Sequence, residues 1–296
     1  MSVRARVATR LGSRAPFTFE FASVFDVASG IASGIASGIV PALVWILVQA
    51  VGGAPASAQT RTDVRRSGLE FASPATQSMQ RDDTLNPGML WAQEGAALWR
   101  AAPRPGGRAC AGCHDEAEKS MRGVAARYPA FDEKLARALN LAQRINACRE
   151  RHQQATPWAV ESQPLLSLEV YVAHQSRGLP IAPDLADPRL VPPRQRGEAL
   201  YQRRIGQLDL SCAMCHDQRA GQRLGGSVMP QAHATGYPIY RLEWQALGSL
   251  QRRLRGCLTG VRAEPFAVDA AEWVELELYL AARSSGMALE TPAVRP

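Results

Sequence analysis

The sequence predicts an all-α protein that contains two tandem copies of one small helical domain. Segments of the first half recur in the second half in the same order, and apolar residues in both halves follow the period of an amphipathic helix. No stretch shows the strict alternation of apolar and polar residues that is typical of a strand. A proline-rich linker at 183–193 separates a first domain, 89–182, from a second domain, 194–296.

Three pairs of matching segments define the repeat. They are EGAALW near Gly95 and GEALYQ near Gly197, YPAF and YPIY, and LEVYVAHQSRG and LELYLAARSSG. Each copy is therefore expected to hold a first helix, a short turn, a middle helix and a terminal helix. Prolines precede the first helices, and Gly178 and Gly286 follow the terminal helices, as is usual at helix ends.

The residues at 1–58 have the order of a secretory signal peptide. Basic residues come first, an apolar run follows at 38–53, and the small residues Ala56 and Ala58 suit cleavage after Ala58. A retained membrane anchor would need about 20 apolar residues, and this run is shorter. We therefore expect an exported protein without a retained anchor, in which residues 59–88 form a polar, turn-rich N-terminal extension.

The charge balance indicates the class of partner. The chain carries a formal net charge of +7, yet it has no lysine-rich or arginine-rich block and no interleaving of basic and aromatic residues. Nucleic-acid binding is therefore not expected. A mild positive balance favours acidic partners or small anions instead.

Four of the six cysteines lie in twin C-x-x-C-H motifs. This motif is the attachment signature of c-type haem, because the two thiols reach the two vinyl groups of one porphyrin edge and the histidine binds the iron. A zinc site would need a second ligand pair nearby, and neither motif has one. We assign Cys110, Cys113 and His114 to one haem, and Cys212, Cys215 and His216 to a second. The predicted domains are thus cytochrome c-like, each with covalent haem.

The other two cysteines occupy matching places late in each middle helix. Cys148 follows His114 by 34 positions, and Cys257 follows His216 by 41. A thiolate is a good iron ligand, so we predict His/Cys ligation of both irons. One alternative is a disulfide between Cys148 and Cys257, which an exported protein would form readily. Another is methionine ligation, for which the candidates are Met121, Met229 and Met287.

Each of these cysteines has an arginine four positions earlier, Arg144 and Arg253, and therefore on the same face of the helix. Such a guanidinium could pair with a haem propionate, a role that its presence in both copies favours. It could instead hold an anionic substrate beside the sulfur. The sequence leaves both roles open, although Gly256 makes the backbone next to Cys257 less crowded.

Two C-x-x-C-H motifs, each with a downstream cysteine, and the segment RLRGCL around Cys257 resemble the SoxA family. Its members are the dihaem subunits of the SoxAX cytochrome complexes of sulfur-oxidising bacteria. The similarity runs roughly from Trp91 to Gly286. It implies the haem attachments and axial ligands given above. It also implies that Cys257 is the catalytic sulfur, which in the family is found as a persulfide, and that Arg253 is placed to bind thiosulfate.

The resemblance further implies a reaction, partners and a compartment. The expected enzyme is a haem-dependent L-cysteine S-thiosulfotransferase, which joins thiosulfate to a cysteine of the SoxYZ carrier protein in the periplasm. Electrons would leave through haem and the monohaem SoxX partner, in a heterodimer, to an acceptor cytochrome c. Two other functions remain as alternatives: a plain dihaem electron carrier, and a related haem enzyme that joins two thiosulfates into tetrathionate.

Overall fold

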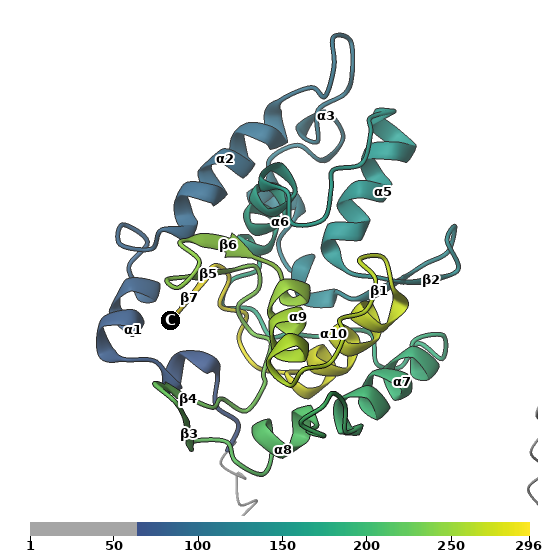
Figure 1. The fold of residues 1–296 in the computed structure, drawn as a ribbon. Coiled ribbons are helices and arrows are strands. Elements are labelled where there is room, and N and C mark those ends of the chain that lie inside the picture. Colours follow the sequence, from purple (N-terminus) through teal and green to yellow (C-terminus); the bar gives the residue numbers. More distant parts are fainter. Residues whose placement is uncertain (1–63) are drawn as a thin grey trace, which may run out of the picture. The chain divides into compact units, whose positions relative to one another are not determined.

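The computed structural model describes residues 64–296, and the expected signal peptide, 1–58, lies outside the described residues. Two copies of one arrangement follow each other along the chain (Figure 1). The extension forms η1 (Gly68–Phe71) and α1 (Pro74–Arg81). The first copy holds α2 (Gly88–Arg100), α3 (Ala111–His114), α4 (Ala117–Ser120), η2 (Ala125–Arg127), β1 (Ala130–Asp132), β2 (Arg137–Leu139), α5 (Leu141–Gln153) and α6 (Gln163–His174). The second copy holds α7 (Val191–Gln202), α8 (Cys212–His216), β3 (Arg223–Leu224), β4 (Ser227–Val228), β5 (Ile239–Arg241), β6 (Ala246–Gly248), α9 (Leu250–Gly260), α10 (Ala271–Arg283) and β7 (Ala293–Arg295).

Helices dominate the described residues, but short strands are present, so the prediction of an all-α fold is confirmed only in part. Hairpin β1–β2 precedes α5, and hairpin β5–β6 precedes α9 at the equivalent place in the second copy. Strand β7 pairs with β5 in parallel and completes a three-stranded sheet. Strands of two or three residues are too short to display a periodic pattern, which explains why the sequence did not reveal them.

The matching glycines of the repeat lie where two long helices cross. Helix α2 packs against α6, and α7 packs against α10 (Figure 1). A Cβ atom on Gly95 would lie 2.0 Å from the carbonyl oxygen of Ser167. One on Gly197 would lie 1.9 Å from that of Glu275. Only glycine permits this approach of one backbone to another, so the repeat keeps it in both copies.

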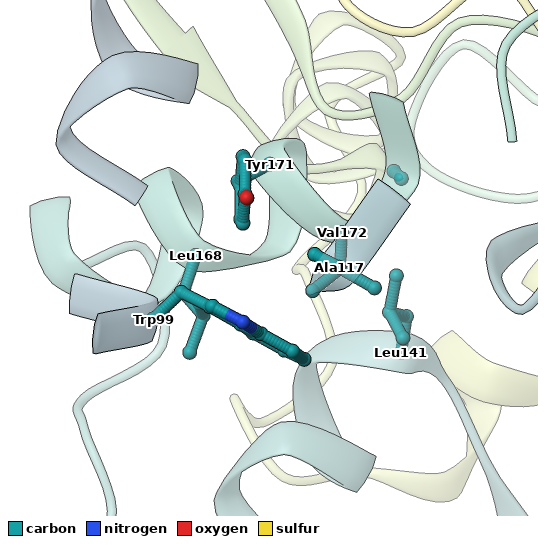
Figure 2. Packing of buried hydrophobic residues seen from close by; sticks show 7 residues of the cluster. Trp99, Ala117, Leu141, Leu168, Tyr171 and Val172 are labelled. Atoms are coloured by element: carbon teal, nitrogen blue, oxygen red, sulfur yellow. The ribbon is translucent and has the colours of Figure 1, made fainter. Parts of the chain in front are cut away.

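Each copy has an apolar cluster next to its C-x-x-C-H motif. Figure 2 shows the first, in which the Trp99 ring lies close to Leu168, with Leu141 on the other side of the cluster. Cys110 packs against this cluster, and Cys212 packs against the second one. The buried members of the second cluster are Tyr201, Ala213, Leu276 and Leu280. The two motifs therefore rest on separate cores.

The described part of the extension packs against its own chain. Helix α1 lies against β7, where Gln80 Oε1 accepts a hydrogen bond from the backbone N–H of Val294 at 3.0 Å. Asp83 forms an ion pair with Arg177 of the first copy, with 2.5 Å between Oδ1 and Nη1. The extension thus connects the two copies. Between residues 64 and 296, no helix combines the length and apolar character needed to cross a membrane.

Candidate functional site

In the second copy, a hydrogen bond sets the orientation of His216. Its Nδ1 lies 2.7 Å from the carbonyl oxygen of Pro230, and because a carbonyl can only accept, Nδ1 carries the proton. Nε2 is left for a second partner, and the imidazole forms a hydrogen bond with the side chain of Cys257. Histidines that bind a metal are commonly held in this way by a carbonyl on the other ring nitrogen.

The surroundings of Cys257 favour its ionised form. Burial raises the pKa of the thiol, but the hydrogen bond with His216 and the positive charge of Arg253 outweigh burial. The pKa of Cys257 is therefore lower than that of an ordinary cysteine. The thiolate is the form of cysteine that binds metals and attacks electrophiles.

The attachment cysteines of the second copy lie on the short helix α8, which begins at Cys212. Ser211 caps this helix, since its Oγ accepts a hydrogen bond from the N–H of Met214 at 3.3 Å. Cys212 and Cys215, with the opposed pair His216 and Cys257, form a donor set that suits a covalently bound haem c. All six cysteines lie among the described residues and none is part of a disulfide, so the alternative disulfide between Cys148 and Cys257 is not formed.

The first copy holds the same residue types in a different arrangement. Cys113 and His114 are exposed, and the His114 ring lies beside the Trp99 ring, with 5.9 Å between centroids. Burial, the largest effect, raises the pKa of Cys148. The structure thus brings Cys257 to His216 but does not bring Cys148 into hydrogen-bonding contact with His114. Among the methionines considered as ligands, Met121 packs against the first apolar cluster.

The two arginines that precede the cysteines have different partners. Arg144 donates from Nη1 to Oδ2 of Asp132 at 2.7 Å, and Arg151 donates twice to the same carboxylate. Within the described chain, the side chain of Arg253 has neither a hydrogen bond nor an ion pair, and its charge acts on Cys257. Of these two guanidinium groups, that of Arg253 is the one available to bind an added anion.

Sequence reasoning missed two residues close to Cys257. Burial raises the pKa of the Tyr237 hydroxyl, and the charges of Arg253 and Cys257 both act on that group. Arg241 is the second; it is buried at the end of β5. It stands where the first copy has Asp132, just beyond the YPAF and YPIY segments. A comparison of the copies residue by residue past those segments would have found this exchange.

A cavity of about 700 Å³ lies between the two copies, and none of the cysteines lines it. Equivalent residues of both copies line it, among them Glu169 on α6 and Glu277 on α10. Burial raises the pKa of both carboxyl groups, that of Glu277 to about 7. Asn140, the N-cap of α5, donates from Nδ2 to Oε1 of Glu277 at 3.2 Å. A hydrogen bond thus joins the copies at the wall of this cavity.

Comparison with protein families gives two matches along the chain. A family model described as SoxA/TsdA, cytochrome c domain, matches residues 94–181 and again residues 196–289. Each match contains one C-x-x-C-H motif and one downstream cysteine. Covalent haem c is the cofactor of cytochrome c domains.

Similar proteins agree with this family. The chain is 37% identical over 229 residues to an L-cysteine S-thiosulfotransferase subunit SoxA of Pseudaminobacter salicylatoxidans, covering 77% of this chain and 80% of the relative. It is 36% identical over 241 residues to that of Rhodovulum sulfidophilum, covering 81% and 84%. A crystal structure of SoxXA from P. pantotrophus matches with a TM-score of 0.75 and 33% identity, covering 78% of this chain and 87% of that chain.

Proposed function

The chain belongs to the SoxA family, and we propose that it catalyses the oxidative conjugation of thiosulfate to a cysteine of a SoxYZ-type carrier protein. One observation in the structure supports this proposal. Cys257 is in hydrogen-bonding contact with His216, and Arg253, one helical turn away, has a charged side chain without an acceptor in the described chain. This arrangement supplies a nucleophilic sulfur and a site for an oxyanion.

Two haem groups are part of the proposal. Cys110 and Cys113 would attach the first, and His114 and Cys148 would bind its iron. Cys212 and Cys215 would attach the second, and His216 and Cys257 would bind its iron. The pairing of His216 Nδ1 with a backbone carbonyl supports the ligand role of this histidine. When bound, haem would supply the redox chemistry by which the two released electrons could leave toward an acceptor cytochrome c.

The chain's own groups have distinct tasks in this reaction. The carrier thiol loses its proton, a sulfur–sulfur bond forms between the carrier and the terminal sulfur of thiosulfate, and two electrons leave. Arg253 holds the sulfonate end of thiosulfate and offsets its charge. Cys257, expected as a persulfide, presents a polarisable sulfur beside that anion. The Nδ1–H of His216 donates to the carbonyl oxygen of Pro230 and holds the ring in place.

Partners and compartment follow from the same family. A SoxX-type monohaem cytochrome is proposed as the second subunit, since a solved structure that resembles this chain is one of SoxXA. We also propose export to the periplasm, with removal of residues 1–58. The proposed domains lie at 89–182 and 194–296. The two family matches, at 94–181 and 196–289, support these domain limits.

The experiment that tests the function measures the product. The haem-loaded protein with its SoxX-type partner is incubated with thiosulfate, a carrier protein and an oxidised acceptor cytochrome, and the carrier is weighed by mass spectrometry. A thiosulfonate adduct on the carrier cysteine, with two electrons transferred per adduct, is the expected result. Tetrathionate as product would instead identify a thiosulfate dehydrogenase. Neither product, with the acceptor still reduced by other donors, would identify an electron carrier.

A second measurement examines the sulfur itself. Trypsin releases the peptide at 256–262, GCLTGVR, which contains Cys257. An added sulfur atom on this peptide is expected, under conditions that preserve persulfides. The matched control is Cys148, which should carry no added sulfur. A plain thiol at Cys257 in the active protein would contradict the persulfide.

A further inference from the structure

An ion pair lies beside the hydrogen bond that orients His216. In that bond, Nδ1 of His216 is 2.7 Å from the carbonyl oxygen of Pro230. The residues that follow these two in the chain, Asp217 and Gln231, are joined by Arg283 at the end of α10. Its Nη2 donates to Oδ1 of Asp217 at 2.7 Å and to the carbonyl oxygen of Gln231 at 3.2 Å. Arg283 therefore ties together the same two segments that the histidine contact joins.

Tyr201 on α7 fixes the carboxylate of this ion pair. Its hydroxyl donates to Oδ1 of Asp217 at 2.9 Å, and the residue is 1% exposed. Burial raises the pKa of Tyr201, so the hydroxyl keeps its proton and remains a donor. The guanidinium carbon of Arg283 lies 4.8 Å from the centre of the Tyr201 ring, a cation–π contact. Both partners of Asp217 are thus held by long helices.

The first copy lacks these groups at the equivalent positions. By the spacing of the repeat, it has Trp99 where the second copy has the tyrosine, and Gln175 where it has the arginine. Trp99 donates from Nε1 to the backbone carbonyl oxygen of Asp115, at 2.9 Å. Among the described residues, the Asp115 carboxylate accepts no hydrogen bond, and the ring of His114 has Trp99 beside it and no carbonyl partner. The ion pair and the histidine–carbonyl contact therefore occur together, in the second copy only.

We infer that Asp217, Arg283 and Tyr201 form a brace that holds the ring of His216. These positioning residues keep segments 216–217 and 230–231 together, so the Nδ1–H stays on its carbonyl acceptor. Such a hydrogen bond fixes the ring orientation and raises the basicity of the other ring nitrogen. A more basic ligand favours oxidised iron, so the brace would lower the reduction potential of a haem bound there. The inference rests on the proposed function, in which His216 binds the iron of the second haem.

Proton exchange at the ring N–H of His216 tests the brace, followed by proton NMR of the haem-loaded complex in deuterium oxide. Arg283→Leu keeps an apolar side chain over the Tyr201 ring and removes the bridging donor. Exchange should become about tenfold faster, as when one hydrogen bond is lost. Arg283→Lys should restore slow exchange, because its ammonium group can still donate to Asp217. Gln175→Ala, the matched change in the first copy, should leave the exchange rate of His216 unchanged.

The reduction potential of the second haem gives an independent readout, measured by spectroelectrochemistry. The double variant Asp217→Ala/Arg283→Leu removes the brace without changing the net charge. The potential should rise by about 59 mV, which is a tenfold loss of preference for oxidised iron in a one-electron couple. The potential of the first haem should stay at its wild-type value.

Tyr201→Phe keeps the test decisive where the double variant loads no second haem. It removes only the hydroxyl that donates to Asp217, and it should change exchange and potential in the same directions by smaller amounts. Wild-type exchange in Arg283→Leu, or fast exchange that Arg283→Lys does not restore, would overturn the inference, as would wild-type values of both quantities in Tyr201→Phe. A complex that shows the expected shifts but forms no carrier adduct would support the brace and overturn the proposed function.

Discussion

The same residue type has different chemistry in the two copies because its neighbours differ. Burial raises the pKa of Cys148, and no imidazole contact offsets it in the described chain. For Cys257, the imidazole of His216 and the guanidinium of Arg253 outweigh burial and lower the pKa. A thiol of low pKa is the reactive one at neutral pH. At the scale of single residues, these neighbours therefore favour Cys257 over Cys148 as the reactive sulfur.

Arg253 is expected to contribute to the transition state more than Arg144 does. Arg253→Gln removes the guanidinium that has no acceptor in the described chain, and kcat/KM for thiosulfate should fall about 100-fold, as when a preorganised oxyanion donor is lost. Steady-state conjugation of the carrier measures this. Arg144→Gln is the matched control: Asp132 keeps Arg151 as its partner, so kcat/KM should stay near the wild-type value. Equal losses in the two variants would show that both arginines serve the haem rather than the substrate.

At the scale of the elements, the repeat predicted the helices and the position of each site residue on them. Cys148 and Cys257 do lie in the second halves of the middle helices α5 and α9. The spacing that relates the two copies in the sequence also relates these two helices, so both cysteines fall at equivalent places. The hairpins were missed since strands of three residues hold no periodic signal. The sequence also did not reveal that His216 contacts its downstream cysteine whereas His114 does not. Whether His114 meets Cys148 depends on tertiary packing beside Trp99, which a motif does not encode.

The helix crossings give a test of the repeated glycines. Gly197→Ala would place a Cβ atom 1.9 Å from the carbonyl oxygen of Glu275, so α7 and α10 must separate. The free energy of unfolding should fall by roughly 3 kcal/mol, in the upper range of overpacking substitutions. Urea unfolding followed by circular dichroism measures it. Gly256→Ala on α9 is the control, because its Cβ would meet no atom within 4 Å, and better helix propensity should raise stability by up to about 1 kcal/mol. Similar losses in both variants would contradict the packing argument.

The buried carboxyl group of α10 predicts how stability depends on pH. Burial raises the pKa of Glu277 from 4.5 to about 7 in the folded protein, against opposing hydrogen bonds from Asn140 and Gln251. The folded state therefore binds this proton more tightly than the unfolded state, and the resulting stability is present below pH 4.5 and lost as pH rises through 7. Glu277→Gln should be more stable than the wild type at pH 8, by at most about 3 kcal/mol.

Unfolding of the wild type and of Glu277→Gln in urea at pH 4.5, 6 and 8 measures this effect. The difference should be small at the lowest pH and should grow as pH rises. Glu243→Gln is the control, because its carboxylate is mostly exposed and its substitution should show no comparable trend. A difference between Glu277→Gln and the wild type that does not vary with pH would show that the glutamate acts through packing alone.

At the scale of the whole molecule, an internal repeat has produced two sites with unequal surroundings. The attachment cysteines pack against different apolar clusters, Cys110 against one and Cys212 against the other. The copies are joined by two shared apolar clusters, in which Leu247 packs against the first copy and Ile181 packs against the second. Backbone hydrogen bonds between the ends of the copies, the hydrogen bond from Asn140 to Glu277 and the extension add to this contact. These contacts hold the copies together without sharing residues of the attachment sites, so each haem site is expected to form independently.

Removal of the two attachment pairs in turn tests this independence. The variant Cys110→Ala/Cys113→Ala should carry one haem and still bind thiosulfate with wild-type Kd, because the second cluster and the Cys257 site keep their own contacts. The variant Cys212→Ala/Cys215→Ala should also carry one haem but lose thiosulfate binding, since the groups around Cys257 are then no longer held against a bound cofactor. Haem content per chain from absorbance and thiosulfate Kd from calorimetry measure both expectations. Loss of thiosulfate binding in the first variant would mean that the copies act as one cooperative site, and retention in the second would mean that Arg253 binds the anion without the second haem.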